Sequence, residues 1–411
     1  MSYLKVAVVV ESFPKLSETF ILNHIKGLID AGVTVKIFAF NDKKDEKVHN
    51  VYLQYNLAAL TVYKPVLPSN PLTRFTKGIA LFFKSVWVDP LPVLRATNFF
   101  KLGISAVKFI NLFEIATFIT REKFDIVHCH FGTIAQQMAT YQQMGVLKAP
   151  LVTTFHGIDV DSPAIRNQPG YYSLLQKEGK LFLSNSSYTK RRLVELGFAA
   201  EKIKVLPVSL DVQKFKRTTA RKKEDTFRLI TIGRLVEFKG IEYSLRAVAA
   251  VINKGTRNIK YTIIGEGPLK EDLVRLTNEL GIERWVEFTG GLSQEKILTC
   301  FEQSDIFLLT GVQASDGRVE NQGLVIQEAQ AMEVPVIVSD IGGVSEGMLD
   351  GVTGYMLPQK NTELIAGKIE FLLSNAAERE KMGKTGRAFV QDKYSIEQTT
   401  RLLLTYYNDF C

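Results

Sequence analysis

Apolar residues along this chain fall into short β-branched runs, which alternate with stretches in which apolar residues recur at helical spacing. One run, Leu4 to Val10, is followed by a polar loop and a helical pattern from about Ser17. Another, Phe227 to Ile232, is followed by a loop and a helical pattern from about Ile241. Both halves then alternate strand and helix, which predicts an α/β protein with two doubly wound, Rossmann-like domains. Because such sheets bind ligands at the carboxyl ends of their strands, we expect the site in a cleft that the two domains face.

The length and composition of the chain agree with two domains. A chain of 411 residues is long for one core, and 46% hydrophobic and 23% charged residues are an ordinary globular balance. The boundary is predicted near Pro207 to Lys216, with a polar, basic surface segment from Lys216 to Asp225 after it. The expected domains are therefore residues 1–208 and 209–392, with residues 393–411 as a final helix.

Two glutamates, Glu320 and Glu328, flank the start of a helix that is predicted to run roughly from Gly323 to Met332. At ~3.6 residues per turn, Glu320 lies on the preceding loop and Glu328 about a turn and a half into the helix. The helix start presents free backbone N–H groups and a positive dipole end, so Gly323 and Leu324 could hold a phosphate between the acids. One acid would then face a sugar and the other a ribose. Taken alone, the pair could also be a solvated loop residue and an exposed helix residue.

Two basic residues, Arg234 and Lys239, follow the strand Phe227 to Ile232 in the sequence GRLVEFKG. Arginine offers a planar fork for a diphosphate, and lysine offers a compact charge on a flexible stem. Together they can neutralise a leaving diphosphate without a metal ion. Their place at the carboxyl end of a strand favours ligand binding over a merely wet surface.

A second strand in this half, Lys260 to Ile264, ends in Gly265, Glu266 and Gly267. The glycines are spaced as in a dinucleotide-binding fingerprint, but Lys270 stands where the third glycine would be. We therefore interpret the segment as a tight turn beside a nucleotide.

Five segments, GRLVEFKG, IIGEGPL, ENQGLVIQEA, TFHGID and VLPVSLDVQKF, together resemble the retaining GT-B glycosyltransferases of the large family usually called family four. The opening VVESFPKLSETFILNHI is similar to the branch that builds bacterial surface polysaccharides, such as the colanic-acid type transferases. The resemblance implies that residues 209–392 bind the donor nucleotide and that the first domain lies on the acceptor side. It also implies that the last helix, which the apolar periodicity of Ile396 to Phe410 allows, crosses back onto the first domain.

The same resemblance implies roles for individual residues. His156, which opens the His-Gly turn after the strand Leu151 to Phe155, would orient a sugar hydroxyl and help to stabilise charge; a capping or packing histidine is the alternative. Glu320 would bind the hydroxyls of the donor sugar, and Glu328 the ribose. The catalytic set is His156, Glu320, Arg234 and Lys239. The donor-binding set is Gly233, Arg234, Lys239, Gly265, Glu266, Gly267, Asn321, Gln322, Gly323, Leu324 and Glu328.

The first loop, Glu11 to Thr19, lacks the Gly-rich turn that many members of the family carry. Its polar residues suggest contact with the acceptor instead, although Ser17 could equally cap the helix that follows. The expected acceptor-side set is Lys15, Ser17, Glu18, His130 and Asp159.

Metal binding is not expected. His128 and His130 lie two apart on a predicted strand, Ile126 to His130, so their side chains point to the same face. A metal site needs at least a third ligand, and the sequence indicates none. We expect no cofactor, and a nucleotide-diphosphate sugar as donor, with a UDP-sugar favoured over a GDP-sugar.

The three cysteines, Cys129, Cys300 and Cys411, are odd in number and far apart, which predicts neither a disulfide framework nor a zinc site and fits a reducing cytoplasm. The apolar run Val6 to Val10 is only of strand length, so no cleavable signal is expected. Charges interrupt every apolar stretch before about 18 residues, which predicts no membrane-spanning helix.

The stretch from about Leu72 to Thr120 is dense in Phe, Trp and Leu and carries six basic residues against two acids. It predicts paired basic amphipathic helices split at Pro90 and Pro92. Lys77 and Lys84 are seven residues apart, as are Lys101 and Lys108, so each pair is expected to share one helical face.

Two interpretations of this stretch stay open. Its basic faces could meet an anionic membrane that presents a lipid-linked acceptor, or its aromatic face could pack on the first sheet with the bases in water. The net charge of +8 fits an acidic partner without choosing between them. Nucleic acid is not expected as a partner, since no recognised binding motif accompanies the charge.

The sequence therefore predicts a hexosyltransferase that moves a sugar from a nucleotide-diphosphate sugar to a sugar or lipid-linked oligosaccharide acceptor, with retention of the anomeric configuration. It would act in the cytoplasm, at the inner face of the membrane, in polysaccharide or glycolipid assembly. Two alternatives remain: an inactive carbohydrate- or partner-binding relative, and a nucleotide-sugar epimerase of similar fold.

Overall fold

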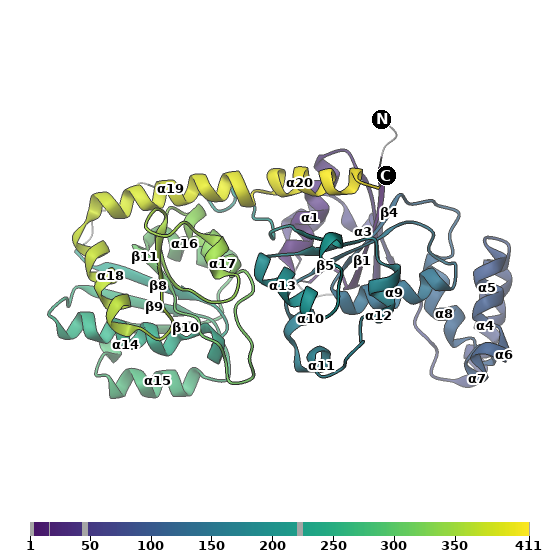
Figure 1. The fold of residues 1–411 in the computed structure, drawn as a ribbon, viewed down its shortest axis with the longest axis horizontal. Coiled ribbons are helices and arrows are strands. Elements are labelled where there is room, and N and C mark those ends of the chain that lie inside the picture. The colour runs from purple at the N-terminus through teal and green to yellow at the C-terminus, as the bar shows by residue number, and fades with distance from the viewer. Residues whose placement is uncertain (1–3, 16, 43–47, 220–224, 411) are drawn as a thin grey trace. The chain divides into compact units, whose positions relative to one another are not determined.

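The computed structural model describes residues 4–15, 17–42, 48–219 and 225–410, and it divides into two compact units (Figure 1). The first unit comprises residues 1–185, 190–206 and 400–411, and the second comprises residues 186–189 and 207–399. Residues 220–224 of the predicted basic segment lie outside the described residues.

The first unit is built on a parallel sheet with the strand order β3-β2-β1-β4-β5-β6-β7. Its strands are β1 Lys5–Ser12, β2 Thr34–Asn41, β3 Thr61–Tyr63, β4 Ile126–His130, β5 Leu151–Phe155, β6 Leu181–Ser184 and β7 Ile203–Val205. The helices between them are α1 Thr19–Asp30, α2 Asn50–Gln54, α3 Leu57–Leu60, α4 Pro71–Val86, α5 Pro90–Ala96, α6 Phe99–Leu102, α7 Ile104–Val107, α8 Ile110–Ile115, α9 Gly132–Gln143, α10 Ile158–Asp161, α11 Pro163–Arg166, α12 Ser173–Glu178 and α13 Ser187–Glu195.

Strand β1 shows why its sequence is almost continuously apolar. Val6 and Val8 pack in a core with α1, whereas Ala7 and Val9 pack in a second core with α9. A central parallel strand is covered on both faces, so both sets of alternating side chains must be apolar. The doubly wound architecture expected from the sequence is thereby confirmed for this unit.

The second unit has the parallel strand order β10-β9-β8-β11-β12-β13. Its strands are β8 Phe227–Ile232, β9 Ile259–Ile264, β10 Val286–Gly290, β11 Ile306–Leu309, β12 Val336–Ser339 and β13 Gly354–Leu357. Its helices are α14 Ile241–Asn253, α15 Lys270–Glu279, α16 Gln294–Gln303, α17 Leu324–Ala331, α18 Thr362–Ser374 and α19 Ala376–Tyr394. Helices α14 and α18 share one core with the sheet, and α16, α17 and α19 share the other.

The last helix, α20 Ile396–Asn408, contributes to the first unit from Thr400 onward. Leu403 and Tyr407 are buried in the core beside α1 and β1. The Tyr407 hydroxyl hydrogen-bonds His128 Nδ1, and the Tyr406 hydroxyl donates to the Val205 carbonyl oxygen at 3.1 Å. Residues from the C-terminus thus complete the core that begins with the first strand.

The order of strands places a crevice in each unit. In the first sheet the chain moves outward in both directions from β1 and β4, and in the second sheet it does so from β8 and β11. Open α/β sheets bind ligands beyond the carboxyl ends of the strands at such a reversal. The residues that follow β1, β4, β8 and β11 are therefore the candidates for the site.

The stretch from Leu72 to Thr120 corrects the sequence-based prediction. It forms five helices, α4 to α8, and not one pair. The predicted break at Pro90 is present, since α4 ends at Val86 and α5 begins at Pro90, whereas Pro92 lies in the first turn of α5, where proline is tolerated. Gly103, with a φ of +57°, follows the short helix α6, so Lys101 belongs to α6 whereas Lys108 follows the end of α7, and the two share no helix. Lys77 and Lys84 do lie together on α4. None of the helices in the described ranges combines the length and apolar character that crossing a bilayer requires.

Candidate functional site

Two glycine-containing loops lie in direct backbone contact at the carboxyl ends of β8 and β9. A Cβ atom on Gly265 would lie 1.9 Å from the Gly233 carbonyl oxygen, and one on Gly267 would lie 2.4 Å from that of Leu235. The Leu235 N–H donates to the Glu266 carbonyl oxygen at 2.9 Å. The glycines after β9 are therefore needed because the loop that carries Arg234 runs against them.

Lys239 and Glu320, which are far apart in the sequence, form a largely buried ion pair. The exposed fractions of their side chains are only 13% and 14%. Lys239 follows β8, and Glu320 lies between β11 and α17, so the strand reversal brings them together. The Gly343 N–H, in the loop after β12, donates to the Glu320 carbonyl oxygen at 3.0 Å and fixes the backbone of this residue.

Three cations surround the buried ring of Phe238. Arg234, Lys239 and Arg318 lie 5.9, 5.8 and 5.8 Å from its centroid. Such distances allow cation–π attraction, which holds long cationic side chains in place without neutralising them. Arg318, which also pairs with Asp316 at 2.6 Å, was not predicted from the sequence, because nothing in its local motif marks it. The cluster suits a ligand with two adjacent phosphates.

Glu328 lies on α17, which begins at Leu324 after the left-handed residue Gly323. Burial raises the pKa of its carboxyl group to about 7, while Lys239 and Lys214 oppose this shift. Lys239 is thus electrostatically coupled to both predicted acids, Glu320 and Glu328. An acid that changes charge near neutral pH is a feature of ligand sites more often than of exposed helix surfaces.

The side chains of Asn321 and Gln322 are engaged by the protein itself. The Asn321 Oδ1 accepts a hydrogen bond from the Thr189 hydroxyl at 3.2 Å. The Gln322 amide oxygen accepts from the Val208 N–H at 2.9 Å, and its amide nitrogen donates to the Val208 carbonyl oxygen at 3.4 Å. These side-chain hydrogen bonds hold the loop before α17 in place. The backbone of Asn321 and Gln322 therefore remains as the part that can contact a donor.

Titration of Glu328 should make the binding of a nucleoside diphosphate depend on pH. An ionised carboxylate accepts hydrogen bonds from ribose hydroxyls, so affinity should rise as the pH increases through about 7. The stability that the group contributes should fall between about pH 4.5 and about pH 7 and stay level above that, since its folded pKa lies above the unfolded value. Isothermal titration from about pH 6 to about pH 8 would measure the affinity. Glu328→Gln should flatten the profile, and an unchanged profile would assign the titration to another group.

Four histidines gather in the first unit, near the carboxyl ends of β4 and β5. His24 Nδ1 lies 2.8 Å from His130 Nε2, and His130 Nδ1 lies 3.0 Å from His156 Nε2. The ring of His128 stacks on that of His130, with centroids 5.2 Å apart. His24 projects from α1 and was missed in the sequence, where it stands among the apolar residues of an ordinary buried helix face.

These imidazoles are held in the neutral form. Burial lowers the pKa of His24 to about 4 and that of His156 to about 3, and lowers the pKa of His128 and His130 well below the usual value. The ring of His156 packs against Phe20 and Phe131, with centroids 4.4 and 4.7 Å away. A neutral imidazole fixed in this way can orient a hydroxyl group by hydrogen bonding, but it carries no proton to give as an acid near pH 7.

Asp159 braces the turn that carries His156. Its Oδ1 accepts the N–H groups of His156 and Gly157 at 2.9 and 3.0 Å, and its Oδ2 accepts that of Gly132 at 2.7 Å. Burial raises its pKa to about 6 against the effect of these bonds. Both oxygen atoms of the Asp159 carboxylate thus accept backbone hydrogen bonds, and the side chain holds the turn in place.

A cavity of about 520 Å³ opens in the first unit beside this turn. Glu11 and Glu18 line one side, and Phe131, Ile158, Asp159 and Tyr171 are among the residues that line the rest. Lys15 pairs with Glu18 at 3.2 Å, and neither Lys15 nor Ser17 lines the cavity. Helix α1 begins after Glu18, so the alternative role of Ser17 as its cap is wrong; the cap position is Glu18, whose side chain makes no capping bond.

The expectation that His128 and His130 lack a third metal ligand is corrected by His24. One nitrogen atom from each of these three residues lies within 4.8 Å of the others, a spacing that could hold a metal ion. Both nitrogen atoms of His128 are engaged, one by Tyr407 and the other by Thr154 Oγ1 at 2.7 Å. Metal binding here would therefore have to displace hydrogen bonds that already satisfy the ring.

The cations around Phe238 predict that catalysis is independent of metal ions, because the positive charge for a diphosphate is already present. After treatment with a chelator, turnover measured by nucleotide release should stay within about threefold of the untreated rate. If the chelator abolished turnover and added magnesium or manganese restored it, this prediction would be wrong. His24, His128 and His130 would then be the residues to test as metal ligands.

Comparison with known proteins agrees with this geometry. Residues 17–214 match the family model "Glycosyltransferase Family 4", and residues 212–389 match "Glycosyl transferases group 1". The chain is 27% identical over 373 residues to the colanic acid biosynthesis glycosyltransferase WcaL of Escherichia coli, an alignment that covers 89% of this chain and 90% of WcaL. It is also 27% identical to the amylovoran biosynthesis glycosyltransferase AmsK of Erwinia amylovora, over 93% of this chain and 94% of AmsK.

The fold has solved counterparts. The Anabaena protein HepE in complex with UDP superimposes with a TM-score of 0.70 at 15% identity, over 99% of this chain and 100% of HepE. This class of structure, with two parallel-sheet α/β domains, is the GT-B fold of glycosyltransferases. The two family models together span residues 17–389, so the chain belongs to the family-four glycosyltransferases, as its motifs predicted.

Proposed function

We propose that the protein transfers a hexose from a nucleotide-diphosphate sugar, a UDP-sugar before a GDP-sugar, to a sugar acceptor with retention of the anomeric configuration. The observation that carries the proposal is Lys239, which pairs with Glu320, acts electrostatically on Glu328 and shares the Phe238 ring with Arg234, where the strand order of the second unit reverses. The names of WcaL and AmsK, both from polysaccharide biosynthesis, support a place in surface-polysaccharide or glycolipid assembly. The lipid-linked acceptor would be met at the inner face of the membrane.

In this proposal the second unit holds the donor. Arg234, Lys239 and the start of α17 at Gly323 bind the diphosphate, Glu328 accepts the ribose hydroxyls, and Glu320 accepts hydroxyls of the sugar. In the free protein Glu320 pairs with Lys239, so the diphosphate would take over the ammonium group and release the carboxylate for the sugar. Most of the rate would then come from positioning and from stabilising the charge on the leaving group.

The chemical step would break the bond between the anomeric carbon and the diphosphate oxygen. The acceptor hydroxyl forms the new bond on the same face of the sugar, and its proton passes to the departing phosphate. His156, neutral and packed against two aromatic rings, would orient a sugar hydroxyl. The cavity of about 520 Å³ in the first unit would receive the acceptor sugar.

Thermal unfolding with a panel of nucleotide sugars tests the proposal directly. A donor at about 100 times its Kd stabilises the folded state by about 2.7 kcal/mol, which a melting curve resolves. We expect one UDP- or GDP-sugar to raise Tm and to be cleaved slowly to the nucleotide. Interconversion of the donor sugar without an acceptor would instead identify an epimerase, and binding without any cleavage or transfer would identify an inactive relative.

A further inference from the structure

Helix α4 exposes one row of apolar residues and packs another row on the first unit. Leu72, Phe75, Ile79 and Phe83 recur on one face and are all exposed, Leu72 by 72% and Phe83 by 60%. On the packed face, Gly78 and Ser85 are buried, and Leu81, Phe82 and Val86 are partly buried against the core. A Cβ atom on Gly78 would lie 2.4 Å from the Phe109 ring, so the packed face needs a glycine there. A helix whose other face met only water would carry polar residues on that face.

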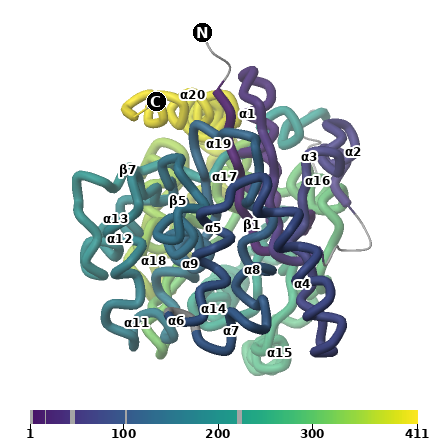
Figure 2. Tube along the Cα trace, turned by 90° about the vertical axis from the view of Figure 1, so that its right-hand side faces the viewer, coloured from purple at the N-terminus to yellow at the C-terminus, as the bar shows by residue number. Residues whose placement is uncertain are grey.

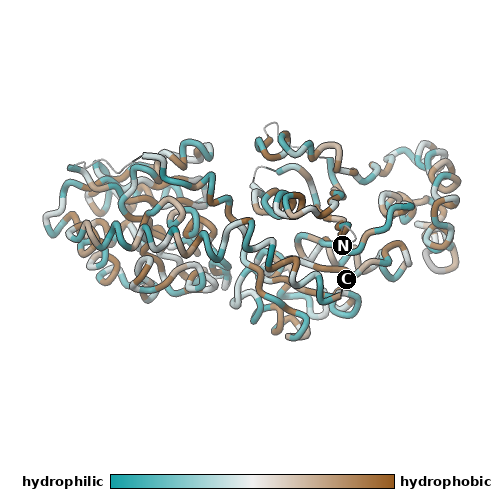
Figure 3. The backbone as a smooth tube through the Cα atoms, turned by 90° about the horizontal axis from the view of Figure 1, so that it is seen from above, coloured by the Kyte–Doolittle hydropathy of each residue, from teal (hydrophilic) through white to brown (hydrophobic). Residues whose placement is uncertain are grey.

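The apolar surface continues beyond α4 over α5, α6 and α7. Trp87 is 79% exposed and Phe100 is 98% exposed. Of the 21 exposed large hydrophobic side chains in the described parts of the chain, 11 lie between Leu72 and Val107, and we call these 11 the apolar surface. Figure 2 looks onto the side of the first unit that bears α4, α6 and α7, and Figure 3 shows hydrophobic positions on these helices. Such a concentration marks an interaction surface.

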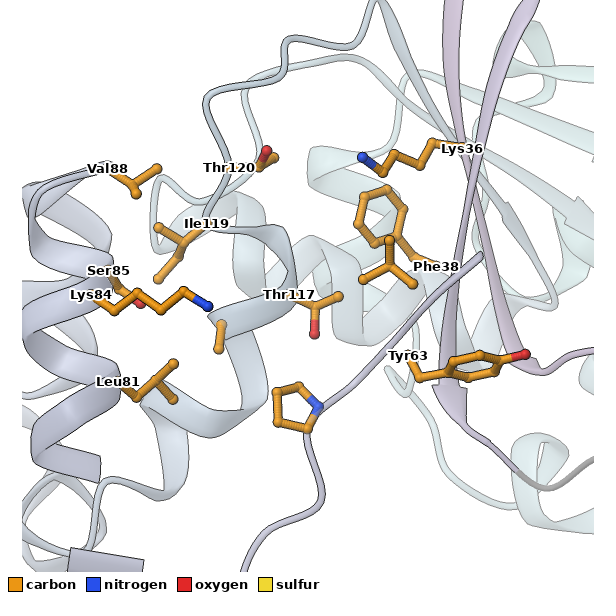
Figure 4. A pocket seen from close by; sticks show the side chains of 13 residues that line it. Lys36, Phe38, Tyr63, Leu81, Lys84, Ser85, Val88, Thr117, Ile119 and Thr120 are labelled. Carbon is orange, nitrogen blue, oxygen red and sulfur yellow. The ribbon is translucent and has the colours of Figure 1, made fainter. Parts of the chain in front are cut away.

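A second cavity, of about 320 Å³, lies beside α4, between this helix and strands β2 and β3. Phe38, Val62 and Leu81 supply apolar walls, and the amino groups of Lys36 and Lys84 point into the cavity from opposite sides (Figure 4). Lys36 pairs with Glu122 at 2.5 Å, whereas the structure gives Lys84 no ion-pair partner among the described residues. Apolar walls with cations at the mouth suit a molecule that joins a phosphate to a hydrocarbon chain.

We propose that the apolar surface inserts into the interfacial layer of an anionic bilayer, and that the cavity beside α4 takes the phosphate of one lipid from that bilayer. Lys77 and Lys84 lie on α4, and no acidic residue occurs between Leu72 and Val88. This charge pattern complements an anionic lipid surface, and aromatic residues with neighbouring bases are typical of interfacial helices. This inference extends the proposed function. It rests on that function in one respect, namely that the enzyme would meet a lipid-linked acceptor at this surface.

The apolar surface is tested by vesicle flotation with phosphatidylcholine vesicles that contain phosphatidylglycerol. Phe83→Ser/Trp87→Ser/Phe100→Ser should weaken binding by at least about tenfold, because hydrophobic insertion supplies most of the affinity. The matched control, Leu53→Ser/Val274→Ser/Leu364→Ser, removes three exposed apolar side chains elsewhere and should bind like the wild type. Equal binding by the two variants overturns the inference. Sedimentation that shows dimers only with an intact apolar surface, without vesicle binding, would assign the surface to a second copy of the chain.

The cavity is tested by a pair of charge reversals on the same helix. Lys84→Glu should lower the preference for phosphatidylglycerol over pure phosphatidylcholine vesicles by at least about fivefold, whereas Lys77→Glu, which does not line the cavity, should change it less than about twofold. Equal losses would show diffuse charge attraction and overturn the lipid site. Donor cleavage should be unaffected in every variant. Absent vesicle binding with intact donor cleavage would reject this inference alone, and vesicle binding without donor cleavage would reject only the proposed function.

Discussion

Replacement of Lys239 by alanine should lower turnover by roughly tenfold to more than a hundredfold, because charge-assisted bonds to a diphosphate are worth about 1.5–3 kcal/mol each. Arg234→Ala should have a similar effect, since the arginine lies beside the same aromatic ring. Arg246→Ala is the matched control, because Arg246 is exposed on α14 and, in the part of the chain that the structure describes, forms an ion pair with Glu242 one turn away on the same helix. Nucleotide release from the donor measures all three, and near-normal turnover in both site variants would remove the diphosphate role.

Because Lys239 is buried, its single substitution should also lower the folding stability, and a double substitution can separate this effect from the effect on turnover. Removing one partner of a buried pair leaves an uncompensated charge, which can cost about 3–5 kcal/mol of folding free energy. Lys239→Ala/Glu320→Ala removes both charges, so its melting temperature should recover most of the loss while turnover stays low. Recovery of stability together with activity would show that the lysine acts on the fold and not on the donor.

Glu320 and Glu328 should separate by ligand. Glu328→Gln should raise the Kd for free nucleoside diphosphate by about tenfold or more, because the ribose loses a charged acceptor. Glu320→Gln should leave that Kd unchanged or lower it, since Lys239 is freed for the diphosphate, yet should cut turnover of the intact donor by a similar factor.

Isothermal titration with the free nucleotide and a turnover assay with the intact donor distinguish the two acids. The control for general damage is the melting temperature of each variant without ligand. If both variants lose the free nucleotide equally, the division of labour between the loop acid and the helix acid is wrong.

The strands and the site motifs could be predicted because their signals are local. The run Phe227 to Ile232 forms a central strand that is covered on both faces. Its β-branched composition is therefore sufficient to identify it as a strand. Arg234, Lys239 and Glu328 belong to short motifs at the ends of predicted strands and in a predicted helix. Their coupling through one lysine could not be derived, because it depends on the order of strands in the sheet.

Other features depend on contacts that no local pattern encodes. His24 looks like one more member of the buried face of α1, and only the neighbouring strand β4 makes it part of a histidine cluster. Arg318 stands in a loop without a motif and is marked only by the ring of Phe238. Helix α4 has the periodicity of a core-facing helix and packs one apolar row on the core, but a second apolar row is exposed, and this cannot be seen without its neighbours.

The burial of Tyr407 against His128 has a consequence for the order in which the chain is synthesised. The ribosome makes strand β1 before the whole second unit and makes this tyrosine after it, yet both belong to one core. While the rest of the polypeptide is being translated, the apolar face around β1 and β4 has no cover from α20, and His128 lacks one of its partners. The first unit therefore completes its core only after the second unit has been synthesised, and removal of the residues from Thr400 onward would take away part of the first unit's core.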